Sequence, residues 1–227
     1  LPAVLSRSRV WHQATAAGQG RVIITGGSTL VESAGRRSFL HLDLVESFRE
    51  GRLTQLTAMG SERSAHLALR VGDRLLVAGG LVNGKLLPTA TAELYDLSSG
   101  NSLGPIANMS VPRTFAMAAP VGAGGDALVA GGLWVKDVQV TSDRFCLQGN
   151  DCGCEAPCFE SVKAFPKGEG RNQGAAISVH CADGDGGAVY VIGGRHDASL
   201  DKSVAAQSYA DVYCYDLSTP EALRKVG

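Results

Sequence analysis

The sequence contains little proline, few aromatic side chains and few charges. Pro accounts for 8 of 227 residues, aromatic side chains for 6% and charged side chains for 19%. Hydrophobic residues make up 44% of the chain, which is enough for a core. Because disordered Gly-rich chains are usually rich in Pro and poor in hydrophobic residues, this composition excludes them and predicts a folded protein.

The charge balance and the lack of long hydrophobic runs exclude two classes of partner. Lys and Arg number 21 against 22 Asp and Glu, a formal net charge of -1, so no basic surface for nucleic acid is expected. No apolar run approaches the length of a membrane-spanning helix, so no membrane insertion is expected either. The start shows neither an initiator Met nor a signal-peptide pattern. We therefore expect a mature product or a piece of a longer chain.

Glycine, by contrast, is abundant, and it marks an internal repeat. The 29 glycines include four pairs, each of which ends a short apolar run. The intervals between the first members of successive pairs are 53, 52 and 62 residues. A buried strand that stops at a turn has this pattern. The pairs, expected to be structural, are Gly26-Gly27, Gly79-Gly80, Gly131-Gly132 and Gly193-Gly194.

Two further elements recur in the same order around each pair. An alternating segment follows, clearest in Glu93 to Leu97 and in Val212 to Leu217. An arginine precedes each pair by 16 to 22 residues, and these arginines are Arg9, Arg63, Arg113 and Arg171. No helical period persists, so each repeat is expected to form four short strands.

This pattern resembles the kelch repeat family, through the Gly pairs, the segment Glu93-Leu94-Tyr95-Asp96 and the Arg63-x-x-His66 opening. The resemblance extends from Arg9 to Leu217. It implies an all-β fold, a β-propeller of four-stranded blades, with one propeller region over 1–227. The four visible blades are expected at about 7–59, 60–109, 110–167 and 168–227. The Trp common in the fourth strand is replaced by Leu53, Leu103 and Phe159.

The number of blades raises the question of closure. Kelch propellers usually have five to seven blades, so four blades predict an incomplete propeller or part of a larger one. The alternative is a four-bladed ring that Leu1 to Ser6 closes by adding a strand to the last blade.

Four of the six cysteines, Cys146, Cys152, Cys154 and Cys158, lie in an insertion at 146–158 in the third repeat. Three interpretations compete. Disulfides fit the even count and a polar loop without a core, and we favour them. Zinc is less well supported, because the Cys-x5-Cys-x-Cys-x3-Cys spacing lacks the usual paired knuckles. Free thiols are the third interpretation.

Two cysteines lie outside the insertion. Cys181 lies in a turn expected on the same face of the propeller, so it is our candidate for a long-range partner of the cluster. Cys214 best fits a buried free thiol. Disulfides would place the protein outside the reducing cytosol: secreted, on the cell surface or in the periplasm.

The expected binding residues lie on the long connections that follow the Gly pairs. Loops on a rigid scaffold commonly carry binding residues, and an exposed Trp beside Lys and Arg is typical of an interaction hot spot. The alternative for Trp134 is packing between blades. The binding candidates are Trp134, Lys136, Arg195 and His196.

No catalytic residue, metal site or cofactor is expected. The sequence lacks His-Glu-x-x-His, Gly-x-Ser-x-Gly and the glycine-rich phosphate loops. The leading hypothesis is a non-enzymatic propeller that binds a protein or a glycan. The alternatives are a carbohydrate enzyme of propeller type, an oxidase or epimerase with its catalytic residues outside this stretch, and a purely structural surface module.

Overall fold

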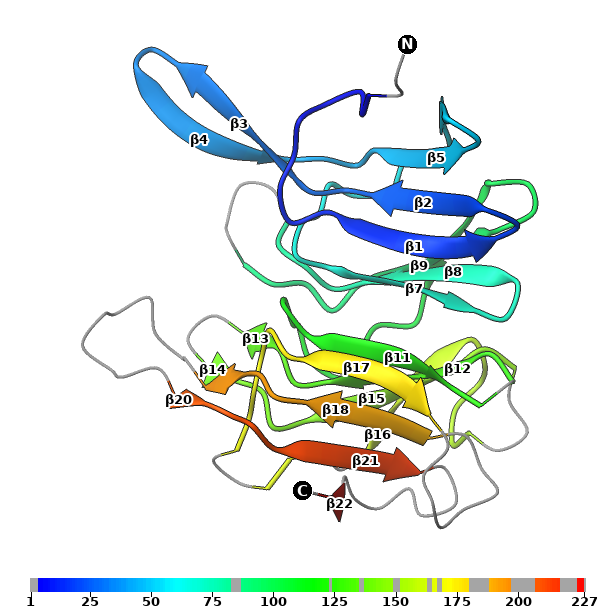
Figure 1. The fold of residues 1–227 in the computed structure, drawn as a ribbon, viewed down its shortest axis with the longest axis vertical. Helices are drawn as coiled ribbons and strands as arrows, with labels where there is room; N and C mark the ends of the chain where they lie inside the picture. Colours follow the sequence, from blue (N-terminus) through cyan, green and yellow to red (C-terminus); the bar gives the residue numbers. More distant parts are fainter. Residues whose placement is uncertain are drawn as a thin grey trace.

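The protein is all-β, as the sequence predicts, and its strands form four antiparallel sheets of four strands each (Figure 1). The computed structural model describes residues 4–82, 87–122, 124–134, 137–148, 152–162, 165–166, 169–179, 188–196, 207–216 and 224–226. Within this part of the chain, no helix is long and apolar enough to cross a membrane.

Each sheet is one blade, and its strands pair antiparallel in chain order. The first blade contains β1 (Gln13–Gly18), β2 (Arg21–Thr25), β5 (Val45–Arg49) and β6 (Arg52–Gln55). The second contains β7 (Leu67–Val71), β8 (Arg74–Ala78), β9 (Ala92–Asp96) and β10 (Ser102–Ile106). The third contains β11 (Met117–Val121), β12 (Asp126–Ala130), β15 (Ser142–Cys146) and β16 (Cys158–Val162). The fourth contains β17 (Ala175–Val179), β18 (Ala188–Ile192), β21 (Val212–Asp216) and β22 (Arg224–Lys225).

Three short hairpins extend the connections between the second and third strands of a blade. They are β3 (Ser28–Ser33) with β4 (Arg36–His41), β13 (Leu133–Trp134) with β14 (Asp137–Val138), and β19 (Arg195–His196) with β20 (Gln207–Ser208). We call the end of the blades that carries these connections, at 26–44, 79–91, 131–141 and 193–211, the hairpin face. The opposite end, with the tight turns near 18–21, 49–52, 71–74 and 96–102, is the turn face.

The glycine pairs lie directly after the second strand of every blade, as the sequence predicts. All eight glycines have a positive φ, between 53° and 100°. At Gly80 an added Cβ would lie 2.6 Å from the carbonyl oxygen of Ser64 and 2.7 Å from Cβ of His66. Only glycine satisfies both the left-handed backbone and the close approach of the next chain segment.

Within the described residues, three apolar clusters each lie between two consecutive blades, and a fourth, small one lies within the last blade. Val45 and Leu75 belong to the cluster between the first two blades, Leu69 and Phe145 to the next, and Val121 and Tyr213 to the third. A single four-stranded sheet cannot cover its own faces, so stacking supplies most of the hydrophobic stabilisation. Among the described residues, no cluster joins the first blade to the fourth.

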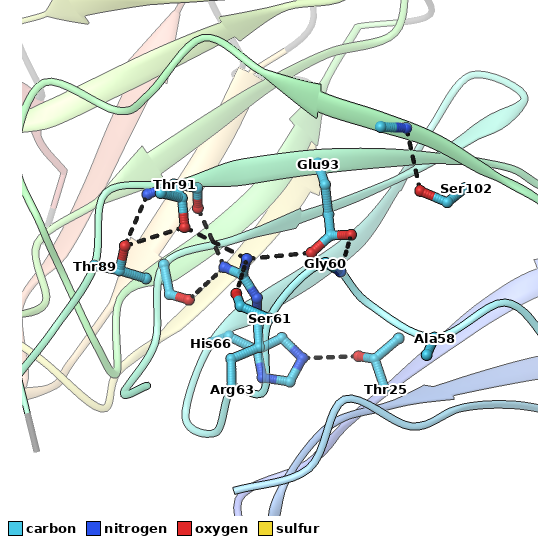
Figure 2. Close-up of polar contacts among 12 residues, drawn as sticks. Thr25, Ala58, Gly60, Ser61, Arg63, His66, Thr89, Thr91, Glu93 and Ser102 are labelled. Carbon is cyan, nitrogen blue, oxygen red and sulfur yellow. Dashed lines mark hydrogen bonds and ion pairs between the residues drawn. The ribbon is translucent and has the colours of Figure 1, made fainter. Parts of the chain in front are cut away.

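The repeated arginine forms hydrogen bonds to the end of the second strand and to the third strand of its own blade. Nη1 of Arg63 donates to the carbonyl oxygen of Gly79 at 2.9 Å, and Nη2 donates to Glu93 at 3.1 Å. Figure 2 shows Arg63 between Glu93 and Thr91, with His66 pointing to Thr25. The arrangement explains why an arginine precedes each Gly pair.

The same contacts recur in the other blades. Arg9 donates to the carbonyl oxygen of Gly26 at 3.2 Å and pairs with Glu46. Arg171 donates to the carbonyl oxygen of Gly193 at 3.3 Å, and its guanidinium lies 4.6 Å from the ring centroid of Tyr213.

The expected alternative closure by Leu1 to Ser6 is wrong. The backbone N–H of Ser6 donates to Glu46 in the first blade at 3.1 Å, and β22 already provides the fourth strand of the last blade. Leu1 to Ala3 lie outside the described residues.

The cysteines of the insertion form two small disulfide-closed loops, Cys146 with Cys152 and Cys154 with Cys158. The expectation of disulfides agrees with the structure, and the adjacent Cys152 and Cys154 do have separate partners. The expectation that Cys181 pairs with this cluster is wrong, because all four sulfurs pair among themselves. Cys181 itself lies outside the described residues. Cys214 is disulfide-bonded, so the expectation that it is a buried free thiol is also wrong.

Candidate functional site

Each blade begins after one residue in a left-handed conformation, two positions beyond the repeated arginine. These residues have φ values of 49° to 56°, and they are Trp11, Ala65, Phe115 and Gln173. Non-glycine residues rarely adopt this conformation, and it costs about 1–3 kcal/mol at each position. Its recurrence in all four repeats shows that the fold requires it.

The four left-handed residues are linked in a chain of backbone hydrogen bonds from blade to blade. Ala65 N–H donates to Trp11 C=O at 2.8 Å, Phe115 N–H to Ala65 C=O at 3.0 Å, and Gln173 N–H to Phe115 C=O at 3.0 Å. The residue before each of them pairs with the residue after the Gly pair, as Thr114 does with Leu133. This series of hydrogen bonds therefore places the four left-handed residues next to one another at the hairpin face.

Two of these side chains, Trp11 and Phe115, are aromatic, and Trp11 contacts the β3–β4 hairpin. The ring centroids of Trp11 and Phe39 are 5.0 Å apart, and those of Trp11 and Phe115 are 6.4 Å apart with an edge-to-face angle of 89°. Leu30 lies directly opposite Phe39 in the hairpin. Trp11 is 43% exposed, Phe39 49% and Leu30 55%. We call Trp11, Leu30, Phe39 and Phe115 the aromatic patch.

The hairpin that carries half of the aromatic patch projects away from the first blade (Figure 1). It turns through Ala34 and Gly35, which have φ of 50° and 72°. Its outer part is charged, with Arg37 Nε 3.2 Å from Glu32. Leu30 and Phe39 lie in short alternating segments around Ala34-Gly35, within the long connection that follows Gly26-Gly27.

Trp134, Arg195 and His196, the described residues among those that the sequence predicts for binding, lie on the same face but are not equally exposed. Trp134 on β13 is 44% exposed. Arg195 is half-buried, and its carbonyl oxygen accepts from Asn172 Nδ2 at 3.2 Å. Nδ1 of His196 lies 2.9 Å from the carbonyl oxygen of Gly170. Lys136 lies outside the described residues. The sequence analysis missed Trp11, Phe39 and Phe115, although Trp11 and Phe115 stand at the same repeat position.

A serine and histidine cluster under the hairpin face is structural. Nδ1 of His41 lies 2.7 Å from Oγ of Ser28 and 3.1 Å from Oγ of Ser64. Such a contact can activate a nucleophile, but all three side chains are buried and none lines the described cavities. Burial lowers the pKa of His41.

His66 is also buried, and its Nε2 lies 2.8 Å from Oγ1 of Thr25. Burial, with the nearby charges of Arg63 and His12, lowers its pKa to about 3. A neutral, enclosed imidazole serves the fold rather than ligand binding.

One group of side chains has metal-like spacing. The ligand atoms of Asp126, Cys146 and Cys152 lie within 4.8 Å of one another. The two sulfurs are joined in a disulfide, so they cannot act as thiolate ligands. Asp126 instead accepts from Arg144 at 2.6 Å.

Comparison with known proteins agrees with the architecture. No protein-family model matches the chain, and no curated protein matches it by sequence. Among solved structures, the chain is similar to YjhT, a kelch-repeat propeller protein of E. coli, with a TM-score of 0.71 and 11% sequence identity. The match covers 96% of this chain and 71% of that chain. At this identity the likeness shows the fold alone: the chain is a β-propeller with four antiparallel blades.

Proposed function

We propose that this protein is a non-enzymatic binding module of kelch type, which holds a protein partner on the aromatic patch of its hairpin face. The observation that carries the proposal is the contact of Trp11 with Phe39, at 5.0 Å between ring centroids, while both rings stay more than two-fifths exposed. Aromatic side chains in water-exposed clusters commonly mark interaction sites.

The large apolar side chains in this arrangement support a role beyond folding. Trp11 and Phe115 sit in the left-handed conformation, where a large side chain has no local advantage over glycine. The β3–β4 hairpin exposes Leu30 and Phe39 on a two-stranded sheet, an element that is marginally stable by itself. Strained, exposed apolar groups on a rigid scaffold are typical of a binding surface.

The composition of the patch favours a protein over a glycan. Sugars need hydrogen-bonding groups beside the aromatic ring, whereas Leu30 offers an aliphatic surface directly opposite Phe39. The surrounding rim is charged, with Arg36, Arg37 and Glu32 all exposed. An apolar centre inside a polar rim is the usual anatomy of a protein interface.

The disulfides support a site of action in an oxidising compartment. Cys146, Cys152, Cys154, Cys158 and Cys214 are all oxidised in the structure. Such bonds persist mainly in secreted, cell-surface and periplasmic proteins. We therefore place the interaction outside the cytosol.

The test is a selection of binders from a displayed peptide library, run in parallel with a glycan array. We expect the library to yield peptides that bind the purified chain, and we expect Phe39→Ser to abolish their binding. The matched control is Leu103→Ser, which removes an exposed leucine from β10 on another blade and should leave binding unchanged.

The outcomes separate the alternatives. Peptide binding that Phe39→Ser removes and Leu103→Ser keeps, with similar melting temperatures for both variants, supports the proposal. Binding to glycans alone would contradict a protein partner and indicate a lectin-like role. Equal loss in both variants would show that the patch is not the site.

A further inference from the structure

A cavity of about 380 Å³ opens on the turn face, between the first and second blades. It lies at the opposite end of the strands from the aromatic patch, and the proposed function does not use it. Three arginines from three different strands line it, Arg21 on β2, Arg49 on β5 and Arg70 on β7.

The charge around this cavity is unbalanced. Of the described acidic residues, only Asp73 lines it. The carboxylate of Asp73 lies 3.2 Å from Nη1 of Arg74, which is outside the lining. The lining therefore carries three positive charges and one negative charge, although the whole chain has a formal net charge of -1. Within the described residues, neither Arg21 nor Arg70 forms an ion pair, whereas Nε of Arg49 lies 3.5 Å from the exposed carboxylate of Glu50, which is outside the lining. Like charges around one cavity repel each other, and a bound anion would relieve this repulsion.

The backbone positions two of the guanidinium groups. Nη2 of Arg21 donates to the carbonyl oxygen of Leu97 in the second blade, and Nε of Arg70 donates to the carbonyl oxygen of Gly72 at 2.8 Å. Nη1 of Arg70 lies 2.8 Å from the point that a Cβ at Gly18 would occupy. A residue larger than glycine at position 18 would therefore displace this guanidinium.

We propose that this cavity binds a small organic dianion, a phosphate monoester or a dicarboxylate. Guanidinium groups match the planar, two-oxygen edge of carboxylate and phosphate, and each keeps unused N–H donors here. The cavity is at the lower end of the size range of small-molecule sites, so the ligand is of metabolite size. A dianion would balance the excess of two positive charges in the lining.

The experiment is isothermal titration of the full chain with inorganic phosphate and with malonate, at an ionic strength held constant with sodium chloride. We expect saturable binding of at least one anion. Saturation by phosphate assigns the site to phosphate esters, and saturation by malonate assigns it to dicarboxylates. Arg70→Gln and Arg49→Gln should each weaken binding about tenfold or more, as expected when one charge-assisted contact is lost.

Two further variants distinguish a built site from general positive charge. Arg36→Gln removes an exposed arginine from β4 on the hairpin face, so it should leave the affinity unchanged. Gly18→Ala keeps every charge but displaces Arg70 and strains the backbone at a φ of 83°, so it should weaken binding. The inference is overturned if neither anion saturates, if Arg36→Gln weakens binding as much as Arg70→Gln, or if Gly18→Ala binds like the original chain.

Discussion

Nη2 of Arg113 lies 2.7 Å from the carboxylate of Asp143, and both side chains are fully buried. The same guanidinium donates to the carbonyl oxygen of Gly131 at 2.7 Å. The contact thus ties together the arginine, the Gly pair and the third strand of the third blade. It explains in one place why these three sequence features recur together.

The first prediction concerns this ion pair. Arg113→Met leaves Asp143 charged and buried without a partner, so we expect a loss of about 3–5 kcal/mol in the free energy of unfolding. Arg37→Met, which breaks the exposed pair with Glu32, should cost no more than about 1 kcal/mol. Chemical denaturation measures both, and comparable losses would show that the buried contact has no special weight.

The second prediction concerns the left-handed residues. Ala65 has φ of 49°, so Ala65→Gly relieves backbone strain of about 1–2 kcal/mol while it removes one methyl group. We expect this variant to be more stable than Ala68→Gly, made within strand β7, by about 1–2 kcal/mol. Thermal unfolding of the two variants decides the matter. Equal destabilisation would mean that the conformation at Ala65 is not strained.

The third prediction concerns pH. The pKa of His66 falls from 6.5 to about 3 on folding, so the unfolded chain takes up a proton at a pH where the folded chain does not. Stability is therefore fully present above pH 6.5 and declines as the pH falls toward 3. Between pH 7.5 and pH 5 we expect His66 alone to cost about 2 kcal/mol.

The matched variant for this measurement is His66→Gln, which removes the titrating group. Its stability should fall less steeply than that of the original chain over the same pH range. The buried His41 also has a lowered pKa and acts in the same direction in both proteins, so it cancels in the comparison. Identical slopes would show that folding does not lower the pKa of His66.

The fourth prediction is the disulfide connectivity. Peptide mapping without reduction should find Cys146 joined to Cys152 and Cys154 joined to Cys158. Because each loop is short, its closure contributes about 2 kcal/mol in the chain-entropy model, less than one bond across the whole insertion would. Cys146 and Cys158 are opposite each other on β15 and β16, so a bond between them is the outcome that would contradict the structure.

The architecture could be predicted from sequence because its signals are local and repeated. The Gly pairs, the arginines and the segments such as Glu93 to Leu97 lie at fixed distances along the chain. Each has a backbone or charge requirement that only a few residue types meet. The residues that replace the fourth-strand Trp did not predict their own burial. The ring centroids of Phe159 and Phe145 are 5.2 Å apart, whereas Leu103 is exposed.

The candidate sites depend on contacts between segments far apart in the sequence, which the sequence pattern alone does not reveal. Trp11 and Phe39 are 28 positions apart and meet only because the segment before β1 and the β3–β4 hairpin lie at the same face. Arg21, Arg49 and Arg70 each look like a solvated turn residue, and only the packing of two blades brings them around one cavity. The pairing of the four clustered cysteines likewise needed the geometry of the insertion.

The central claim, that the aromatic patch is where a partner binds, is tested most directly by hydrogen–deuterium exchange with and without a library-selected peptide. The account predicts that the bound peptide slows exchange in the β3–β4 hairpin and around Trp11 and Phe115. Exchange in the turns of the turn face, near Gly18 and Gly72, should not change. Protection confined to the turn face, or absent from the β3–β4 hairpin, would contradict the claim.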